Sequence, residues 1–139
     1  YEGVLVRKKE KMGEQLEKKP EIGFKMQVFD RREGEKWPDT PYTKWFDYDI
    51  IKGRLVMRTR REGDYITVTA DGKRQTLKKF FINQKVPAGK RDEIPLIADG
   101  NEIVWIVGYR QNKAYQITER TVKIVQIEIY GGEKNGRDN

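Results

Sequence analysis

The residues best suited to chemistry in this sequence are the lysines and arginines of residues 72–91. This segment reads GKRQTLKKFFINQKVPAGKR and carries seven basic residues and no acidic residue. Its basic residues are Lys73, Arg74, Lys78, Lys79, Lys85, Lys90 and Arg91. The remaining residues sum to zero charge, so this segment accounts for the whole net charge of +7. Because concentrated positive charge is typical of surfaces that bind phosphate, we predict a phosphate-binding surface here. A solvated basic helix face is the alternative.

Asp47 and Asp49 are the candidates for acid–base or metal chemistry. They flank Tyr48, and alternate residues of a strand share one face. Two neighbouring carboxylates can transfer protons or hold Mg²⁺. No other group of residues in the sequence supports catalysis at this pair, and the phosphate-binding loop pattern G-x-x-x-x-G-K-[ST] is absent. We therefore expect neither a catalytic residue nor a metal site in this chain.

The composition excludes several classes of enzyme. The 139 residues include no Cys, no His and no Ser. Disulfides, Cys or His metal sites, and Ser–His–Asp or Cys–His nucleophiles are therefore excluded. The longest apolar run, Ile103–Val107, is too short to span a membrane. Since the sequence lacks an initiator Met and an apolar leader, we expect a fragment of a longer, cytoplasmic protein.

One helix is predicted to position the basic segment. Thr76 is a favourable helix N-cap, and Leu77, Phe80 and Phe81 follow with the spacing of a buried stripe. Lys78 and Lys79 lie off that stripe and should face outward. We expect the helix to cover residues 77–85 and to end before Pro87, with a further helical turn over 88–92.

The rest of the sequence predicts mainly strands, which gives a β-rich α+β domain. Strands are expected at residues 3–7, 24–29, 54–59, 65–69, 95–98, 102–107, 115–118 and 122–130, whereas the type of 44–51 is ambiguous and 8–21 is a charged loop or a weak helix. Asp99-Gly100 predicts a hairpin turn. We expect Trp37, Trp45 and Trp105 in the core.

The turn at residues 60–64 adds Arg60 and Arg61 to the candidate cations. Gly63 should supply the turn and Asp64 should cap it locally, and this structural interpretation is compatible with a binding role for the arginines. Tyr109 and Arg110 could contact nucleic acid, although packing of the ring with a solvated arginine is the favoured interpretation.

Several motifs together resemble the C-terminal domain of bacterial tRNA(Ile)-lysidine synthase. They are RTRREGD (58–64), LKKFFINQKVPAGKRDEIPLIADG (77–100) and EIVWIVGYR (102–110). The likeness covers roughly residues 41–118, and it is weaker over residues 1–40. We accordingly divide the chain into lead-in strands and a charged loop at 1–40, a tRNA-binding domain at 41–130 and a disordered tail at 131–139.

The resemblance implies a fold and a role. The implied fold is a β-rich layered domain of mixed and antiparallel sheets with one main helix, similar also to a domain of the phenylalanyl-tRNA synthetase β-subunit. The parent enzyme uses ATP to ligate lysine to the wobble cytidine of an isoleucine tRNA. ATP and Mg²⁺ would belong to its N-terminal catalytic domain, whose Ser-Gly-Gly-x-Asp-Ser loop is absent from this serine-free chain.

The implied role of this chain is to hold the acceptor region of tRNA(Ile) while the catalytic domain acts on the anticodon. The residues expected to bind tRNA are Lys73, Arg74, Lys78, Lys79, Lys85, Lys90, Arg91, Arg60 and Arg61. Other expected partners are the N-terminal catalytic domain of the same protein and a second copy of the chain, and no membrane. A docking module without direct RNA binding is the alternative.

Overall fold

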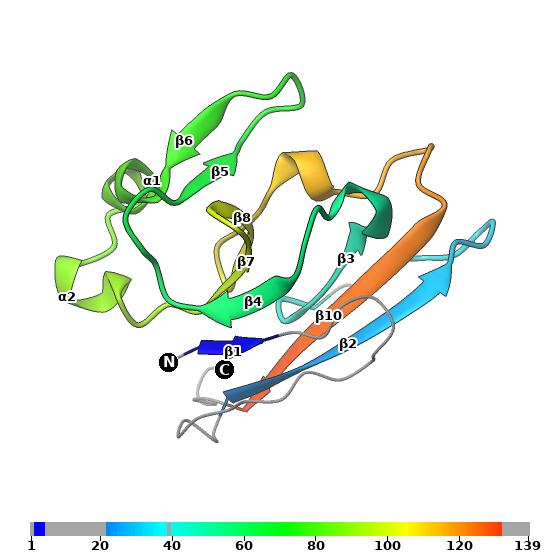
Figure 1. Ribbon diagram of the computed structural model, residues 1–139, viewed down its shortest axis with the longest axis horizontal. Coiled ribbons are helices and arrows are strands. Elements are labelled where there is room, and N and C mark those ends of the chain that lie inside the picture. The colour runs from blue at the N-terminus through cyan, green and yellow to red at the C-terminus, as the bar shows by residue number, and fades with distance from the viewer. Residues whose placement is uncertain (1, 5–21, 39, 132–139) are drawn as a thin grey trace.

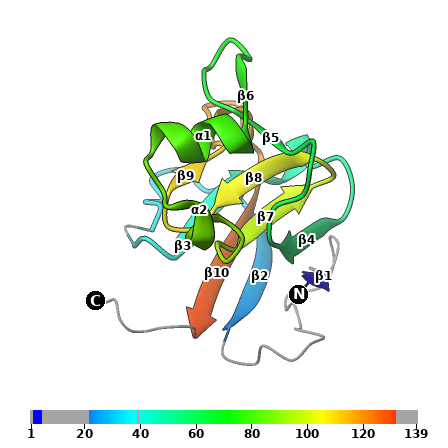
Figure 2. The same ribbon diagram turned by 90° about the vertical axis from the view of Figure 1, so that its left-hand side faces the viewer.

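The fold is a layered α+β domain, seen in a computed structural model that describes residues 2–4, 22–38 and 40–131 (Figure 1). Two sheets pack face to face, and two short helices cover the outer face of the larger sheet (Figures 1 and 2). Within the described residues, no helix has the length and apolar character needed to cross a membrane. The arrangement of two sheets and one main helix confirms the predicted β-rich layered fold.

The larger sheet has seven strands, in the order β1-β4-β7-β8-β5-β6 with β9 against β8. Its strands are β1 (Glu2–Val4), β4 (Leu55–Arg58), β5 (Tyr65–Thr67), β6 (Arg74–Thr76), β7 (Leu96–Asp99), β8 (Glu102–Ile106) and β9 (Arg110–Gln111). The predicted hairpin around Asp99-Gly100 is confirmed, because β7 and β8 pair antiparallel on either side of it. The sheet is mixed because β5 pairs with β8 in parallel.

The smaller sheet is antiparallel and has the order β2-β10-β3. Its strands are β2 (Ile22–Asp30), β3 (Thr43–Asp47) and β10 (Lys123–Gly131). β2 and β10 pair along their whole length, from Lys123 opposite Asp30 to Gly131 opposite Ile22. Residues 22–30 therefore form a sheet with strands that lie within residues 41–131.

Two apolar clusters hold the layers together. Between the sheets, Phe24, Phe46 and Ile127 pack with Met57 and Trp105. On the outer face of the larger sheet, the helix packs onto a second cluster made of Leu77, Phe80, Phe81, Val86, Ile66, Leu96, Ala98, Ile103 and Ile106. Burial of these apolar side chains holds the helix on the sheet.

The structure corrects two expectations about local structure and resolves the type of a third segment. Helix α1 (Leu77–Asn83) is shorter than predicted, because Lys85 adopts a left-handed backbone conformation with φ of 59° before Pro87. The predicted strand at 115–118 is wrong: a 3₁₀ helix, η2 (Lys113–Tyr115), buries Tyr115 instead. Residues 44–51 divide into strand β3 and a 3₁₀ helix, η1 (Tyr48–Ile50).

The three tryptophans differ in how deeply they are buried. Trp105 is buried as predicted, and Trp45 is half-buried, but Trp37 is 57% exposed and does not belong to the core. The Pro-rich connector that carries Trp37 lies outside both sheets, so no strand pairing draws the ring inward. The charged segment 8–21 and residues 132–139 lie outside the described residues, as do residues 5–7 of the first predicted strand.

Candidate nucleic-acid interface

Helix α1 is held against the larger sheet and exposes its lysines to solvent. The Thr76 hydroxyl accepts a hydrogen bond of 3.1 Å from the backbone N–H of Lys79, which caps the helix as predicted. Phe80 and Phe81 are buried on the sheet side, whereas Lys78 and Lys79 are exposed. The second helix, α2 (Ala88–Arg91), includes Lys90 and lies on the same side of the larger sheet as α1 (Figure 2).

The lysines of the basic segment have no acidic partner within the described residues. Ion pairs in this part of the chain join Lys25 to Glu128, Lys52 to Glu102, Arg58 to Asp64, Arg60 to Asp92 and Lys123 to Asp30. Within the basic segment 72–91, the exposed lysines left out of these pairs are Lys73, Lys78, Lys79, Lys85 and Lys90. Their charge is therefore available to an external anion, in contrast with the paired lysines of the smaller sheet.

The arginines of the same segment are held in place by the protein. The Arg74 guanidinium lies 4.4 Å from the centre of the Tyr65 ring, which is cation–π distance. The Nε of Arg91 donates a hydrogen bond of 2.8 Å to the backbone carbonyl of Val86. Arginines oriented in this way lose little conformational entropy when they bind a phosphate.

The turn at residues 60–64 is rigid and lies beside the start of α1. Gly63 has φ of 91°, and the Asp64 carboxylate accepts a hydrogen bond of 2.7 Å from the backbone N–H of Arg61, as predicted. Arg58, from the adjacent strand, forms a buried ion pair with the same carboxylate. The backbone N–H of Leu77 donates to the carbonyl of Asp64, which ties the turn to the helix.

A cleft of about 600 Å³ lies between this turn, the start of α1 and the end of α2. The residues around it include four of the predicted cations, namely Arg60, Arg61, Lys78 and Arg91. Asp92 also lines the cleft and pairs with the Nε of Arg60 at 2.8 Å. The structure thus joins the turn to the basic segment, whereas Lys73, Arg74, Lys79, Lys85 and Lys90 lie outside the cleft lining.

Asp47 and Asp49 are not arranged for catalysis. The strand ends at Asp47, so the two carboxylates do not share a strand face as expected. The Asp47 carboxylate caps η1 by accepting from the backbone N–H of Asp49 at 3.0 Å, and it also accepts from the Thr121 hydroxyl at 2.9 Å. Within the described ranges, no cluster of acidic side chains could hold a metal ion.

A buried polar network around Glu102 was missed by sequence reasoning. The Glu102 carboxylate accepts hydrogen bonds from Thr67, Asn112 and Lys52. Burial raises the pKa of Glu102, but these bonds and the Lys52 charge outweigh burial and hold the pKa below its usual value. An acidic residue at the start of an otherwise apolar strand was the signal that could have revealed it. The network links β5, β8 and the segment that follows β9.

The sequence and the fold both match characterised proteins. The family model described as "TilS substrate C-terminal domain" matches residues 55–128. The tRNA(Ile)-lysidine synthase of Caldanaerobacter subterraneus subsp. tengcongensis is 41% identical over 105 residues, which are 76% of this chain and 22% of that protein. The tRNA(Ile)-lysidine synthase of Clostridium tetani is 40% identical over 94 residues, which are 68% of this chain and 20% of that protein. The chain thus spans about a fifth of the length of these relatives.

A solved structure described as "Crystal structure of TILS C-terminal domain" has the same fold. It superposes with a TM-score of 0.63 over 83% of this chain and 88% of that chain, at 19% sequence identity. This likeness confirms the arrangement of two sheets and one main helix, and at this identity it does not extend to the residues of the surface.

Proposed function

This chain belongs to the TilS substrate C-terminal domain family, and we propose that it binds tRNA(Ile) for a tRNA(Ile)-lysidine synthase. The surface around α1, α2 and the turn at 60–64 holds the acceptor region of the tRNA. The whole protein ligates lysine to the wobble cytidine with ATP and Mg²⁺, which are bound by a part of the enzyme that this chain does not include. We propose no catalytic role for the residues of this chain.

The observation that carries the proposal is the set of exposed lysines without ion-pair partners in the described part of the chain. Lys78 and Lys79 project from a helix that is locked onto the larger sheet, and Lys73 and Lys90 flank it. Double-stranded RNA is recognised mainly by its shape and by contacts to phosphates and 2′-hydroxyls. Lysines on a helix that is packed firmly against a sheet suit this form of recognition, because their spacing is fixed before binding.

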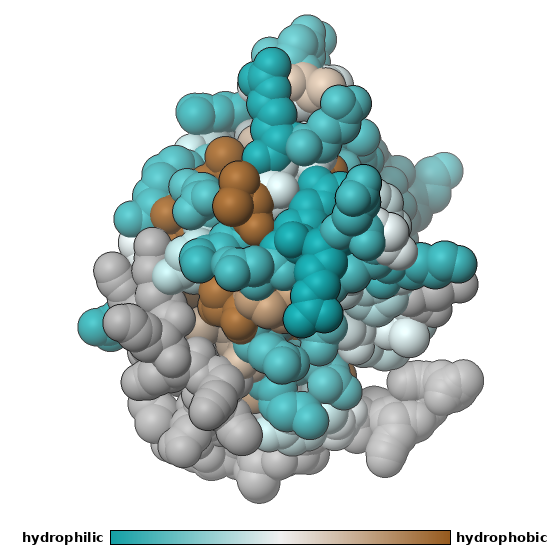
Figure 3. All heavy atoms as spheres, turned by 90° about the vertical axis from the view of Figure 1, so that its right-hand side faces the viewer, coloured by the Kyte–Doolittle hydropathy of each residue, from teal (hydrophilic) through white to brown (hydrophobic). Residues whose placement is uncertain are grey.

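A docking module is less well supported by the face shown in Figure 3. Figure 3 shows one face of the molecule on which hydrophilic side chains predominate and hydrophobic atoms form small, separate groups. Surfaces that bind a protein partner usually offer a contiguous apolar patch. The N-terminal domain of the enzyme and a second copy of the chain remain proposed partners, which size-exclusion chromatography of the full protein would detect.

A fluorescence anisotropy titration of this chain with tRNA tests the proposal. The double variant K78E/K79E replaces two cations with two anions, and K25E/K123E makes the same change of charge on the smaller sheet. We expect K78E/K79E to lose most of the affinity, at least ten-fold by analogy with close like-charge contacts, and K25E/K123E to bind like wild type. Equal affinities for the two variants would contradict the proposal.

A further inference from the structure

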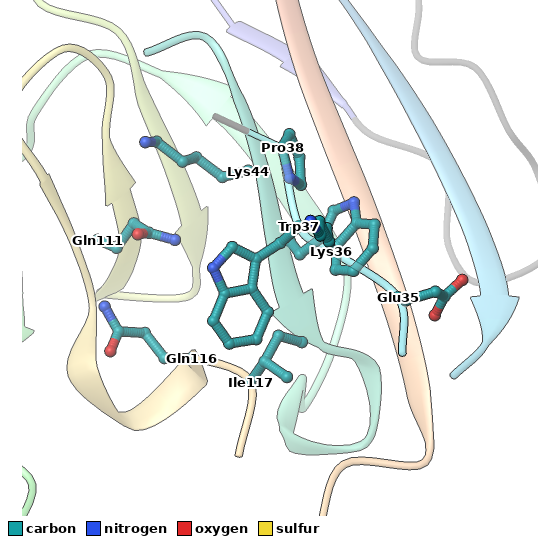
Figure 4. Close-up of a pocket in the computed structure, with 9 residues that line it drawn as sticks. Glu35, Lys36, Trp37, Pro38, Lys44, Gln111, Gln116 and Ile117 are labelled. Atoms are coloured by element: carbon teal, nitrogen blue, oxygen red, sulfur yellow. The ribbon is translucent and has the colours of Figure 1, made fainter. Parts of the chain in front are cut away.

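A second cavity, of about 670 Å³, lies away from α1 and contains the exposed Trp37. It is lined by Glu35, Lys36, Trp37, Pro38, Lys44, Trp45, Gln111, Gln116 and Ile117 (Figure 4). The Trp37 indole lies inside this ring of residues, with Gln111 and Gln116 on one side of it and Ile117 beside it (Figure 4). An exposed indole in a cavity offers a flat surface on which another ring can stack.

The cavity walls are fixed by the fold. Trp45 donates from its Nε1 to the Gln126 side chain at 2.8 Å and packs edge-on against Phe29. Gln111 pairs with Trp105 in the larger sheet, and the next residue, Asn112, is fully buried and bonded to Glu102. The backbone that carries the two glutamines is therefore anchored to the core, which preorganises the cavity.

The polar groups of the cavity are available to a ligand. The amides of Gln111 and Gln116 form no hydrogen bond with any other described residue, although both are partly buried. Lys36 and Lys44 supply positive charge. Glu35, the one acid in the lining, accepts a hydrogen bond from the backbone N–H of Arg32 and is thus engaged in the preceding turn.

We infer that this cavity binds an unpaired adenine nucleotide of RNA. The base stacks on Trp37, the amides of Gln111 and Gln116 bind its hydrogen-bonding edge, and Lys44 meets its phosphate. A glutamine amide offers a donor and an acceptor side by side, which matches the N6 and N7 atoms of adenine. Aromatic stacking of splayed, unpaired bases is the usual way in which proteins bind single-stranded RNA.

The inference rests on the proposed RNA-binding function, and the surface between the two sites supports it. A smaller cavity, of about 190 Å³, shares Lys44 and Gln111 with the Trp37 cavity and is also lined by Tyr109 and Arg110. The Tyr109 ring in turn contacts Phe80 and Phe81 of α1, with ring centres 6.5 and 6.4 Å apart. The smaller cavity therefore connects Tyr109, which packs against α1, with the Trp37 cavity.

The test uses a short fluorescent oligoadenylate, an oligouridylate of the same length and a blunt-ended RNA duplex. Trp37→Ala should weaken oligoadenylate binding by about 5- to 150-fold, the range measured when a stacking aromatic is removed. Trp37→Phe should retain most of the affinity because it keeps an aromatic face. Q111A/Q116A should abolish the preference for adenine over uracil. All three variants should bind the duplex like wild type.

The outcomes separate this inference from the proposed function. If the duplex binds and oligoadenylate binding is unaffected by Trp37→Ala, the cavity does not hold a base, and the proposed function stands. If neither RNA binds wild type, both fail. If oligoproline, but not oligoadenylate, changes the tryptophan fluorescence of wild type, and Trp37→Ala removes this change, the cavity binds a peptide and the inference is overturned.

Discussion

Arg58 and Asp64 form a buried ion pair in which the two terminal guanidinium nitrogens, Nη1 and Nη2, each donate to one carboxylate oxygen at 2.9 Å. Their side chains are only 3% and 0% exposed. The pair joins strand β4 to the turn that carries Arg60 and Arg61 and to the start of α1, because the carbonyl of Asp64 accepts from the N–H of Leu77. This relationship determines how the turn and the helix face the same cleft.

Breaking this pair should strongly destabilise the fold. Arg58→Met leaves the Asp64 carboxylate buried without its partner, which typically costs about 3–5 kcal/mol of unfolding free energy. Arg60→Gln, which breaks the exposed pair with Asp92, should cost less than about 1 kcal/mol. Urea unfolding of both variants measures the two losses, and equal losses would show that Arg58 does not have this structural role.

Loss of the α1 cap should have a smaller effect. Thr76→Ala removes the acceptor for the N–H of Lys79 and should lower the unfolding free energy by about 1 kcal/mol. Thr76→Ser or Thr76→Asp should retain stability, because each keeps an oxygen at the capping position. Thermal unfolding distinguishes the three, and equal loss in Thr76→Ser would rule out capping as the cause.

The Glu102 network should make the unfolding free energy depend on pH in the acidic range. Because the folded pKa of Glu102 lies below its unfolded value, its carboxylate contributes stability above the unfolded pKa. This contribution is lost as the pH falls from the ordinary glutamate range, about 4.3, through the folded pKa. Glu102→Gln should flatten this part of the curve of unfolding free energy against pH. If Glu102→Gln leaves the slope of unfolding free energy against pH unchanged, the pKa of Glu102 is not lowered by folding.

Removing an acid from the basic cleft should strengthen RNA binding. Asp92 lines the cleft and engages Arg60, so Asp92→Asn both frees the guanidinium and removes a charge that repels phosphate. We expect tRNA affinity to rise about two- to five-fold, which corresponds to an exposed ion pair of less than about 1 kcal/mol. Asp30→Asn, on the smaller sheet, is the matched control and should change nothing. A fall in affinity would show that Asp92 instead holds Arg60 in its binding position.

What the sequence predicted was mostly local. The spacing of Leu77, Phe80 and Phe81 identified the buried face of α1, and Asp99-Gly100 identified the hairpin, because both signals span only a few residues. The resemblance to lysidine synthases was confirmed by the family match.

What the sequence did not predict depends on contacts between distant segments. The parallel pairing of Tyr65 with Glu102 and the pair of Arg60 with Asp92 cross more than thirty residues. Trp37 was placed in the core because its ring is large and apolar, but a Pro-rich connector holds it outside both sheets. Which cations share the cleft could likewise not be derived from spacing along the chain.

The dependence of tRNA affinity on salt tests the central claim most directly. If the exposed lysines around α1 bind phosphates, a plot of log K against log salt concentration should be steep. The K78Q/K79Q variant should reduce the slope by about 0.7–0.9 for each lysine removed, and K25Q/K123Q should leave it unchanged. A slope near zero for wild type, or one that K78Q/K79Q does not alter, would contradict binding of tRNA by this surface.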